Sequence, residues 1–351
     1  MKFNDTLART WRENILFSVL VELTYRCNLN CFFCYNDTAL NGVPLATEQY
    51  FRFFEDLRDL GTLDLTLSGG EPMAHPEFFT LGRKARELGF LVRVKTNGHA
   101  LRGKLLQRMR EEVDPFILEI SLHGASSETH DRQTRVPGSF ARLMANLREA
   151  QALGLRLKLN APLTVWNERE IGAMYALADA LDVPLLVDPQ ITGRDDGDLE
   201  PLQISPSREG VTRLFELQRQ RAAAIHGNRE SPADDVVGDA DETAPVAGAK
   251  HCGAGSSTIV VDPYGNVYPC VQWRRRVGNL HEQSIQTLWN HSGELAEVRR
   301  IAVEVKEAVD RHNTPGFAFC PGSAEHETGS PTRLYPIARL MLELRQKIPA
   351  A

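Results

Sequence analysis

Three cysteines early in the chain, Cys27, Cys31 and Cys34, are the residues best suited to chemistry, and they stand at offsets of four and three. Three thiolates on so short a segment can hold three corners of a cubane iron–sulfur cluster and leave the fourth iron without a protein ligand. An iron with an open position can bind and activate a second molecule, as the open position of a catalytic metal site does. The spacing therefore predicts a metal centre that takes a further ligand.

The same spacing also fits a buried helix, because offsets of four and seven share a helix face and free cysteine packs as a small hydrophobe. Asn28, Asn30 and Asn36 crowd the segment, however, and such polar residues are typical of loops. Phe32 and Phe33 lie between the thiols, where they either wall a cavity or simply pack in the core. A ligand loop is therefore favoured over a helix.

Composition places the chain among ordinary globular proteins. Its 351 residues are 42% hydrophobic and 25% charged, with a net charge of -6, which suits one large α/β domain with an appended module and excludes a nucleic-acid-binding surface. The longest apolar run, residues 15–21, is far too short for a membrane span, and the first residues are not typical of a targeting peptide. The sequence predicts a cytoplasmic protein whose six cysteines are metal ligands and not disulfides.

Short β-like runs alternate with amphipathic helical stretches over the first half of the chain. The predicted strands are residues 18–24, 63–68, 90–96, 116–122, 155–161 and 184–188. The helices between them are predicted at residues 47–61, 78–88, 101–113, 140–153 and 168–181. Six successive units imply a parallel sheet with right-handed crossovers, either an open barrel (the first choice) or a doubly wound sheet. Ligands of both folds lie at the carboxyl ends of the strands, where the cysteine loop follows the first strand.

The second half of the chain has a different pattern. A helix is predicted at 205–226, followed by a flexible acidic linker at 228–249 and a small hairpin at 257–270 with Cys252 and Cys270 near its ends. Further helices are predicted at 285–289, 295–309 and 334–347. We therefore expect a barrel domain at 1–204, a helix and linker at 205–250, and a small α+β domain at 251–351.

The cysteine loop, ending in Tyr35 after the first strand, resembles the radical S-adenosylmethionine (radical SAM) superfamily. Further motifs follow in the same order, each at the end of a predicted strand: Gly69-Gly70-Glu71-Pro72, Thr96-Asn97-Gly98, Ser121 and Asn160, with Arg135 after the fourth strand. The resemblance implies a partial (β/α)6 barrel of radical SAM type with a [4Fe-4S] cluster on Cys27, Cys31 and Cys34.

The resemblance also implies how S-adenosylmethionine (SAM) binds. The segment from Gly69 to Pro72 would meet the methionine amino group, since two glycines let the backbone approach a ligand closely. Ser121 and Arg135 would receive the carboxylate and Asn160 the ribose. Tyr35 and Asn97 are expected in the same cofactor site. SAM on the open iron would then be cleaved by an external electron to a 5′-deoxyadenosyl radical, which abstracts hydrogen from the substrate.

The C-terminal module resembles the SPASM and Twitch modules, which hold auxiliary iron–sulfur clusters, through the spacing of Cys252, Gly265 and Cys270. It departs from a full SPASM module, which has seven cysteines, because only three follow residue 250, the last in Cys320-Pro-Gly-Ser323. We expect one auxiliary [4Fe-4S] cluster on Cys252, Cys270 and Cys320. Its fourth ligand is left open between Ser323, His326, Glu325 and none, and a structural zinc ion on the three thiols is the alternative.

Several residues are weaker candidates for the catalytic centre. Asp188, Asp195 and Asp196 follow the sixth strand and are either a base and substrate ligands or solvated turn residues. His123 is a further candidate, although a structural role fits it better. Glu22 on the first strand requires a Lys or Arg partner if its side chain points into the barrel.

Family members with SPASM or Twitch modules mostly modify peptides. We therefore expect an enzyme that crosslinks or epimerises a ribosomally made peptide. The alternatives are a small-molecule dehydrogenase or epimerase and, from another class, a non-catalytic iron–sulfur or zinc protein. Flavodoxin or ferredoxin is the expected electron donor. The barrel begins within about fifteen residues, so leader binding is expected from a separate leader-peptide-binding protein or from the barrel face in place of an N-terminal winged helix. No nucleic acid or membrane partner is expected.

Overall fold

The computed structural model describes residues 3–227 and 249–348, so the predicted linker at 228–249 lies almost wholly outside the described residues. The strands are β1 (Ser18–Glu22), β2 (Asp64–Ser68), β3 (Leu91–Thr96), β4 (Ile117–Ser121), β5 (Leu157–Pro162), β6 (Leu185–Asp188), β7 (Thr258–Val261), β8 (Asn266–Tyr268) and β9 (Gly278–Asn279). The helices are α1 (Phe3–Glu13), α2 (Thr47–Asp59), α3 (Phe78–Glu87), α4 (Gly103–Arg108), α5 (Ser127–Thr134), α6 (Ser139–Ala152), α7 (Ile171–Ala180), α8 (Arg208–Gly227), α9 (Ile285–His291), α10 (Gly293–Asp310), α11 (Pro321–Thr328) and α12 (Pro336–Arg345). Short helical turns are η1 (Pro72–Ala74), η2 (Met109–Val113) and η3 (Glu200–Ile204).

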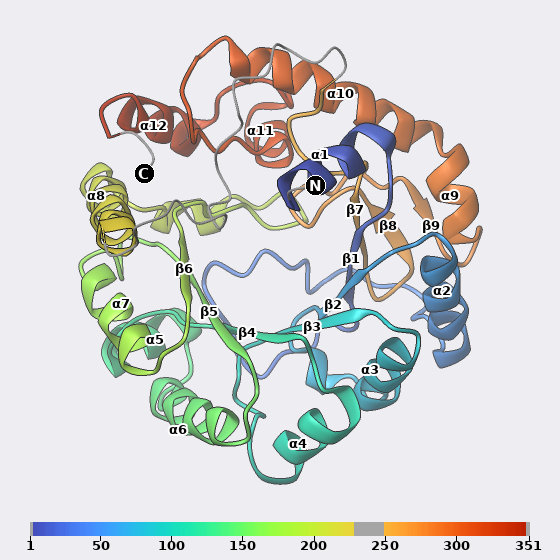
Figure 1. Ribbon diagram of the computed structural model, residues 1–351, viewed down its shortest axis with the longest axis horizontal. Helices are drawn as coiled ribbons and strands as arrows, with labels where there is room; N and C mark the ends of the chain where they lie inside the picture. The colour runs from blue at the N-terminus through green and yellow to red at the C-terminus, as the bar shows by residue number, and fades with distance from the viewer. Residues whose placement is uncertain (1–2, 228–248, 349–351) are drawn as a thin grey trace.

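Strands β1 to β6 form a curved parallel sheet in chain order, with helices α2 to α7 around its outside (Figure 1). This confirms the predicted partial barrel. The loop that leaves β1, blue in Figure 1, crosses the middle of the ring. Residues at the ends of the six strands are thereby brought around one opening.

The C-terminal hairpin joins the barrel sheet, which the sequence did not predict. β7 pairs with β1 in parallel, with Ser18 opposite Thr258, and β8 and β9 continue the sheet antiparallel. The described strands thus form one nine-stranded sheet in the order β6-β5-β4-β3-β2-β1-β7-β8-β9. The division into domains at residues 204 and 250 stays a prediction, because the sheet runs across it.

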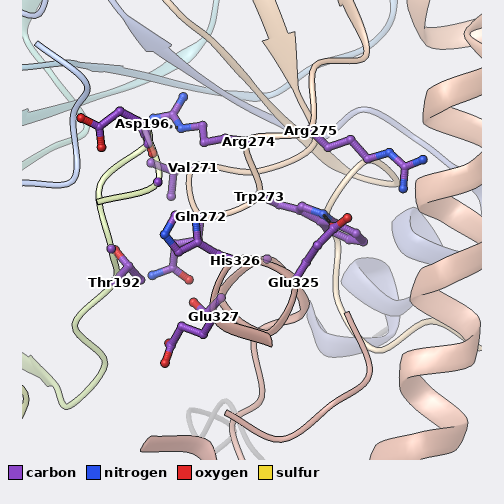
Figure 2. Close-up of a pocket in the computed structure, with 15 residues that line it drawn as sticks. Thr192, Asp196, Val271, Gln272, Trp273, Arg274, Arg275, Glu325, His326 and Glu327 are labelled. Carbon is purple, nitrogen blue, oxygen red and sulfur yellow. Dashed lines mark hydrogen bonds and ion pairs between the residues drawn. The ribbon is translucent and has the colours of Figure 1, made fainter. Parts of the chain in front are cut away.

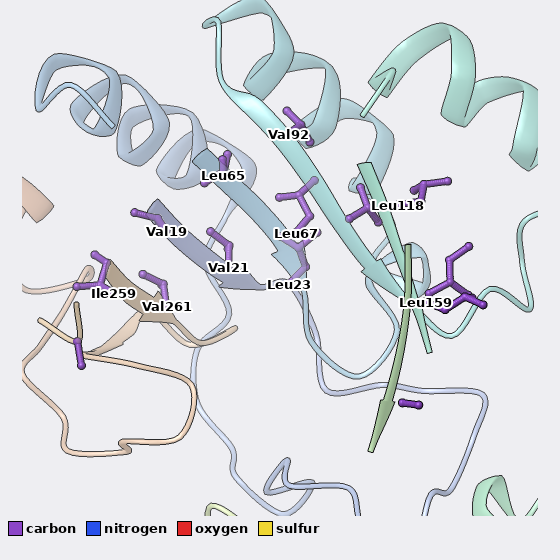
Figure 3. Packing of buried hydrophobic residues seen from close by; sticks show 14 of the residues in the cluster. Val19, Val21, Leu23, Leu65, Leu67, Val92, Leu118, Leu159, Ile259 and Val261 are labelled. Atoms are coloured by element: carbon purple, nitrogen blue, oxygen red, sulfur yellow. The ribbon is translucent and has the colours of Figure 1, made fainter. Parts of the chain in front are cut away.

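The two faces of the sheet differ in polarity because side chains alternate along a strand. Apolar side chains on the outer face pack under the helices, among them Val21, Leu67, Leu118, Leu159 and Val261 (Figure 3). The inner face is polar, and the guanidinium of Arg93 there pairs with the carboxylates of Asp64 and Glu119. The outer face holds the barrel together, and the inner face leaves polar groups available to ligands.

Helix α2 shows how local sequence builds this outer layer. Its buried residues Tyr50, Phe53, Phe54 and Leu57 recur at helical spacing, and each is worth about 1.5–3 kcal/mol on burial. The helix is followed by Gly61, whose φ of 81° is a left-handed conformation that glycine adopts readily.

The sequence missed three short helices, α1, α5 and α11. α5 and α11 are eight residues each, and so short a helix depends on tertiary packing more than on its own periodicity. The predicted helix at 101–113 divides into α4 and the π-helical turn η2. Within the described residues, no helix is long and apolar enough to cross a membrane.

Candidate functional site

The segment from Cys27 to Cys34 is a loop held by backbone hydrogen bonds, and the helical alternative is wrong. The N–H groups of Asn30 and Phe32 donate to the carbonyls of Thr134 and Gln133 at 3.1 Å each. The end of α5 therefore fixes the ligand loop from one side. Phe32 packs against Trp166, and Phe33 packs against His123, with ring centroids 5.1 and 5.0 Å apart.

The three thiols of this loop lie close enough to influence one another. Burial raises the pKa of Cys31 well above its usual range, the charges of Cys34 and Cys27 raise it further, and Arg135 lowers it. The three sulfurs are a thiolate donor set that suits iron–sulfur clusters. Among the described residues, no three His, Cys, Asp or Glu side chains lie close enough together to bind one metal ion. A cubane cluster does not require this, because each thiolate binds a separate iron and the thiolates are spaced more widely. The donor set fits the predicted cluster.

Two glycines at the end of β2 let the chain approach this loop. A Cβ on Gly69, whose φ is 123°, would lie 2.3 Å from the Thr24 carbonyl oxygen, and one on Gly70 would lie 2.6 Å from that of Arg26. The Gly70 N–H donates to the Thr24 carbonyl at 2.7 Å. Residues 69–70 are thus fixed against the segment that leads into Cys27.

Glu71 and Asn97 connect the ends of β2 and β3 to the same loop. The buried Glu71 carboxylate accepts hydrogen bonds at 2.9 Å from the Thr96 hydroxyl and from the Asn97 N–H. Burial raises the pKa of Glu71 to about 7, although these bonds oppose the shift. The Asn97 amide lies 3.6 Å from the Cys27 sulfur. Pro72 follows as the first residue of η1.

The remaining residues of the predicted SAM site lie on β4, β5 and the end of α5. Ser121 and Asn160 are paired in register. The Asn160 amide donates to Glu119 at 2.9 Å, while its buried Oδ1 has no hydrogen-bond partner within the described ranges. An unpaired buried acceptor suits a ligand hydroxyl. Arg135, at a φ of 56°, lies over the Phe32 ring at 4.8 Å.

Cys252, Cys270 and Cys320 form a second set of thiols. Burial raises the pKa of Cys252 to about 12, and the charges of Cys270 and Cys320 contribute to the shift. The Cys320 N–H donates to the Tyr335 hydroxyl at 3.2 Å, and its thiol donates to the side-chain amide oxygen (Oε1) of Gln272 at 3.1 Å. All six cysteines of the chain are free thiols.

Arg274 links the two halves of the molecule, and the sequence did not single it out. Its guanidinium binds both carboxylate oxygens of the fully buried Glu22 at 2.7 and 3.0 Å, and its Nε lies 3.0 Å from Asp195. Glu22 therefore has the cationic partner that its inward position requires. Three successive arginines follow Cys270-Val-Gln-Trp, but no local pattern indicates which of them turns inward.

A cavity of about 430 Å³ lies between the loop after β6, the turn after Cys270, and helix α11 (Figure 2). It is lined by Thr192, Gly193, Asp195, Asp196, Gly197, Val271, Gln272, Trp273, Arg274, Arg275, Gly322, Ser323, Glu325, His326 and Glu327. Asp195 connects it to the first thiol set, since its N–H donates to the Tyr35 carbonyl at 2.8 Å. Burial raises the pKa of Asp195 to about 7, and Arg274 opposes the shift. Ser323 connects the cavity to Cys320.

Two weaker candidates lie apart from this cavity lining. His123 is buried, and its backbone N–H donates to the ring Nδ1 of His130 at 3.2 Å. Burial holds the pKa of His123 well below its usual range, and its ring packs against that of Phe33. Asp188 accepts from the Gln190 N–H at 2.9 Å, and burial raises its pKa.

Comparison with known proteins identifies this arrangement. The Radical SAM superfamily matches residues 21–178, and the SPASM iron–sulfur cluster-binding domain matches residues 252–315. A PqqA peptide cyclase from Ruegeria pomeroyi is 32% identical over 255 residues, which are 72% of this chain and 67% of that protein. The chain belongs to the radical SAM superfamily. The radical SAM protein is thus an enzyme, and its [4Fe-4S] and SAM cofactors follow from the two domains.

Two further relatives extend the comparison. An AdoMet-dependent heme synthase from Methanosarcina barkeri is 28% identical over 298 residues, which are 79% of this radical SAM chain and 83% of that protein. The structure of Streptococcus suis SuiB bound to S-adenosylmethionine has a TM-score of 0.69 at 16% identity and covers 94% of this chain and 79% of that one. This second likeness confirms the fold.

Proposed function

We propose that this radical SAM enzyme modifies a ribosomally made peptide, by crosslinking or epimerisation, in the cavity between its two thiol sets. The PqqA peptide cyclase among its relatives supports a peptide substrate. The observation that carries the proposal is the lining of the cavity. Four carboxyl groups (Asp195, Asp196, Glu325, Glu327) stand there with two guanidinium groups (Arg274, Arg275). Such a polar, mainly acidic wall suits the amides and cationic side chains of a peptide.

The charges that line the cavity also favour a peptide over the second candidate substrate. The M. barkeri relative is named for heme synthesis, so a small molecule of that kind is the second candidate. Arg274 is already paired with Glu22. Of the two arginines in the lining, Arg275 is therefore the one that does not pair with Glu22. A substrate that carries several carboxylates would therefore meet like charges in this cavity.

The proposed roles of the residues follow from their positions. When bound, the cluster and SAM supply a carbon radical that abstracts hydrogen from the substrate. Cys27, Cys31 and Cys34 hold the cluster, and Gly69 and Gly70 give SAM access to it. Four further residues complete the SAM site. The Asn160 oxygen receives the ribose, Arg135 and Ser121 receive the carboxylate, and Asn97 orients Cys27. Asp195 is the proposed base or substrate ligand, because it lies between Tyr35 and the cavity.

The proposal is tested in three steps with anaerobically reconstituted enzyme. The chain should bind about eight irons, roughly four per cluster. Cys31→Ala should abolish formation of 5′-deoxyadenosine from SAM under dithionite, whereas Cys320→Ala should keep that reaction and lose substrate modification. A precursor peptide encoded beside this gene should gain a crosslink or an inverted residue, detected by mass spectrometry in D2O. Conversion of a porphyrin precursor in place of the peptide would overturn the proposal.

We also propose the partners and location that the sequence suggested. Six free cysteines fit a reducing compartment, the cytoplasm. Flavodoxin or ferredoxin is the proposed electron donor, and a separate protein is proposed to bind the leader of the peptide. Replacement of dithionite by reduced flavodoxin should sustain turnover, and affinity capture with the precursor peptide should recover the leader-binding protein.

A further inference from the structure

Ser323 is a buried hydroxyl next to the auxiliary thiols. Its side chain is 3% exposed, and its Oγ has no hydrogen-bond partner of ordinary geometry among residues 3–227 and 249–348. A buried hydroxyl without a partner is costly, so such a group in a native protein calls for an explanation. Ligation to a metal would satisfy it.

The start of α11 brings Ser323 to Cys320. Cys320 is the N-cap of this helix, and its sulfur accepts from the Ser323 N–H at 3.4 Å. Burial raises the pKa of the Cys320 thiol, and the hydroxyl and N–H of Ser323 lower it. Ser323 therefore lies beside the Cys320 sulfur in the first turn of the helix. This turn packs closely on the segment after Cys270, because a Cβ on Gly322 would lie 2.2 Å from the backbone carbonyl oxygen of Gln272.

Three other side chains of α11, Glu325, His326 and Glu327, are placed less well than Ser323 to reach the auxiliary cluster. The Glu325 carboxylate accepts a hydrogen bond from the indole N–H of Trp273. His326 is exposed, and its Nε2 faces Gly193. Glu327 also has a buried oxygen, Oε1, without a hydrogen-bond partner in the described residues. It follows Cys320 by seven residues, about two helical turns, whereas Ser323 lies in the first turn beside the Cys320 sulfur.

We propose that the Ser323 oxygen is the fourth protein ligand of the auxiliary [4Fe-4S] cluster held by Cys252, Cys270 and Cys320. The hydroxyl loses its proton to water in the adjoining cavity when the cluster is assembled, and the resulting alkoxide binds the iron that has no thiolate. The auxiliary cluster is then closed, so substrate binds in the cavity through polar side chains and not through iron. The proposal rests on the auxiliary cluster but not on the identity of the substrate.

The test uses the full-length chain with Cys27, Cys31 and Cys34 replaced by alanine, so that only the auxiliary cluster is assembled. Ser323→Ala should change the EPR spectrum of the dithionite-reduced cluster. On mild oxidation it should lose about one of its four irons and give a three-iron signal, because that iron lacks a protein ligand. Ser323→Cys should keep all four irons with a changed spectrum. Ser256→Ala removes another fully buried hydroxyl that lacks a partner in the described residues and should leave iron content and spectrum unchanged.

A second measurement uses cyanide to probe whether the auxiliary cluster has an open iron. Cyanide should leave the spectrum of the chain with Ser323 unchanged, because a closed cluster has no site for it, and should shift that of Ser323→Ala. A cyanide-induced shift in the presence of Ser323, or identical spectra for the serine and alanine chains, would overturn the proposal. Failure of these thiols to bind any iron would also overturn it. The proposed function is tested separately, by 5′-deoxyadenosine formation and peptide modification in the unsubstituted enzyme.

Discussion

Removal of the Arg274 guanidinium should be among the most destabilising single changes in this protein. Arg274 makes a bidentate contact with Glu22 at 2.7 and 3.0 Å and a third contact with Asp195 at 3.0 Å. The side chains of Glu22, Arg274 and Asp195 are 0%, 12% and 14% exposed. Water therefore cannot replace the lost partner of Glu22, whose carboxylate stays fully buried, although Asp195 borders the cavity.

The expected loss follows from this burial. Breaking a buried ion pair from one side costs about 3–5 kcal/mol, because the other charge stays buried and unpaired. The Tyr25 hydroxyl, which donates to Glu22 at 3.0 Å, compensates part of that cost. We therefore expect Arg274→Met to lower the free energy of unfolding by about 3 kcal/mol, a large part of the roughly 5–15 kcal/mol typical of a native protein.

The assay is urea unfolding of the cluster-loaded protein, followed by circular dichroism under anaerobic conditions. Arg300→Met is the matched control, because Arg300 pairs with Glu297 and Glu304 on the surface of α10, and such pairs contribute at most about 1 kcal/mol. Addition of Glu22→Gln to Arg274→Met should recover part of the stability, since it removes a buried charge. An Arg274→Met protein no less stable than Arg300→Met would refute this reasoning.

Two further predictions concern the SAM site and the packing behind it. Gly70→Ala should destabilise the protein by about 1–3 kcal/mol, the usual cost of overpacking, and weaken SAM binding in calorimetry, because its Cβ would lie 2.6 Å from two carbonyl oxygens. Gly172→Ala, with nothing within 4 Å, should be neutral or stabilising by up to about 1 kcal/mol. Burial lowers the pKa of His130 to about 4, so the unfolded chain binds an extra proton below the ordinary value near 6.5, and stability should fall as the pH drops from about 6.5 towards 4. Urea unfolding across that pH range should show that the free energy of unfolding depends less steeply on pH in His130→Gln than in the unsubstituted protein. An equal dependence on pH would contradict the role of His130.

The sequence by itself determined the chemistry and most of the barrel. The offsets of Cys27, Cys31 and Cys34 lie within one loop, and the motifs at Gly69, Ser121 and Asn160 each lie at the end of a β-like run. Such features are local, because strand and helix periodicity depends on residues close in the chain. The parallel order of β1 to β6 then follows from the alternation of strands and helices.

Only the tertiary structure decided how the C-terminal half completes the site. The pairing of β7 with β1 and the contact of Arg274 with Glu22, 252 residues apart, depend on packing that no local periodicity encodes. The same is true of the turn that brings Gln272 to Cys320 and of the orientation of Ser323 in the first turn of α11. Arg275 is next to Arg274 in the chain, and His326 was a candidate ligand like Ser323, but the fold gives each of them a different neighbourhood. The three-cysteine loop was therefore evident from its spacing together with the asparagines around it, while the surroundings of the second set of thiols required the fold.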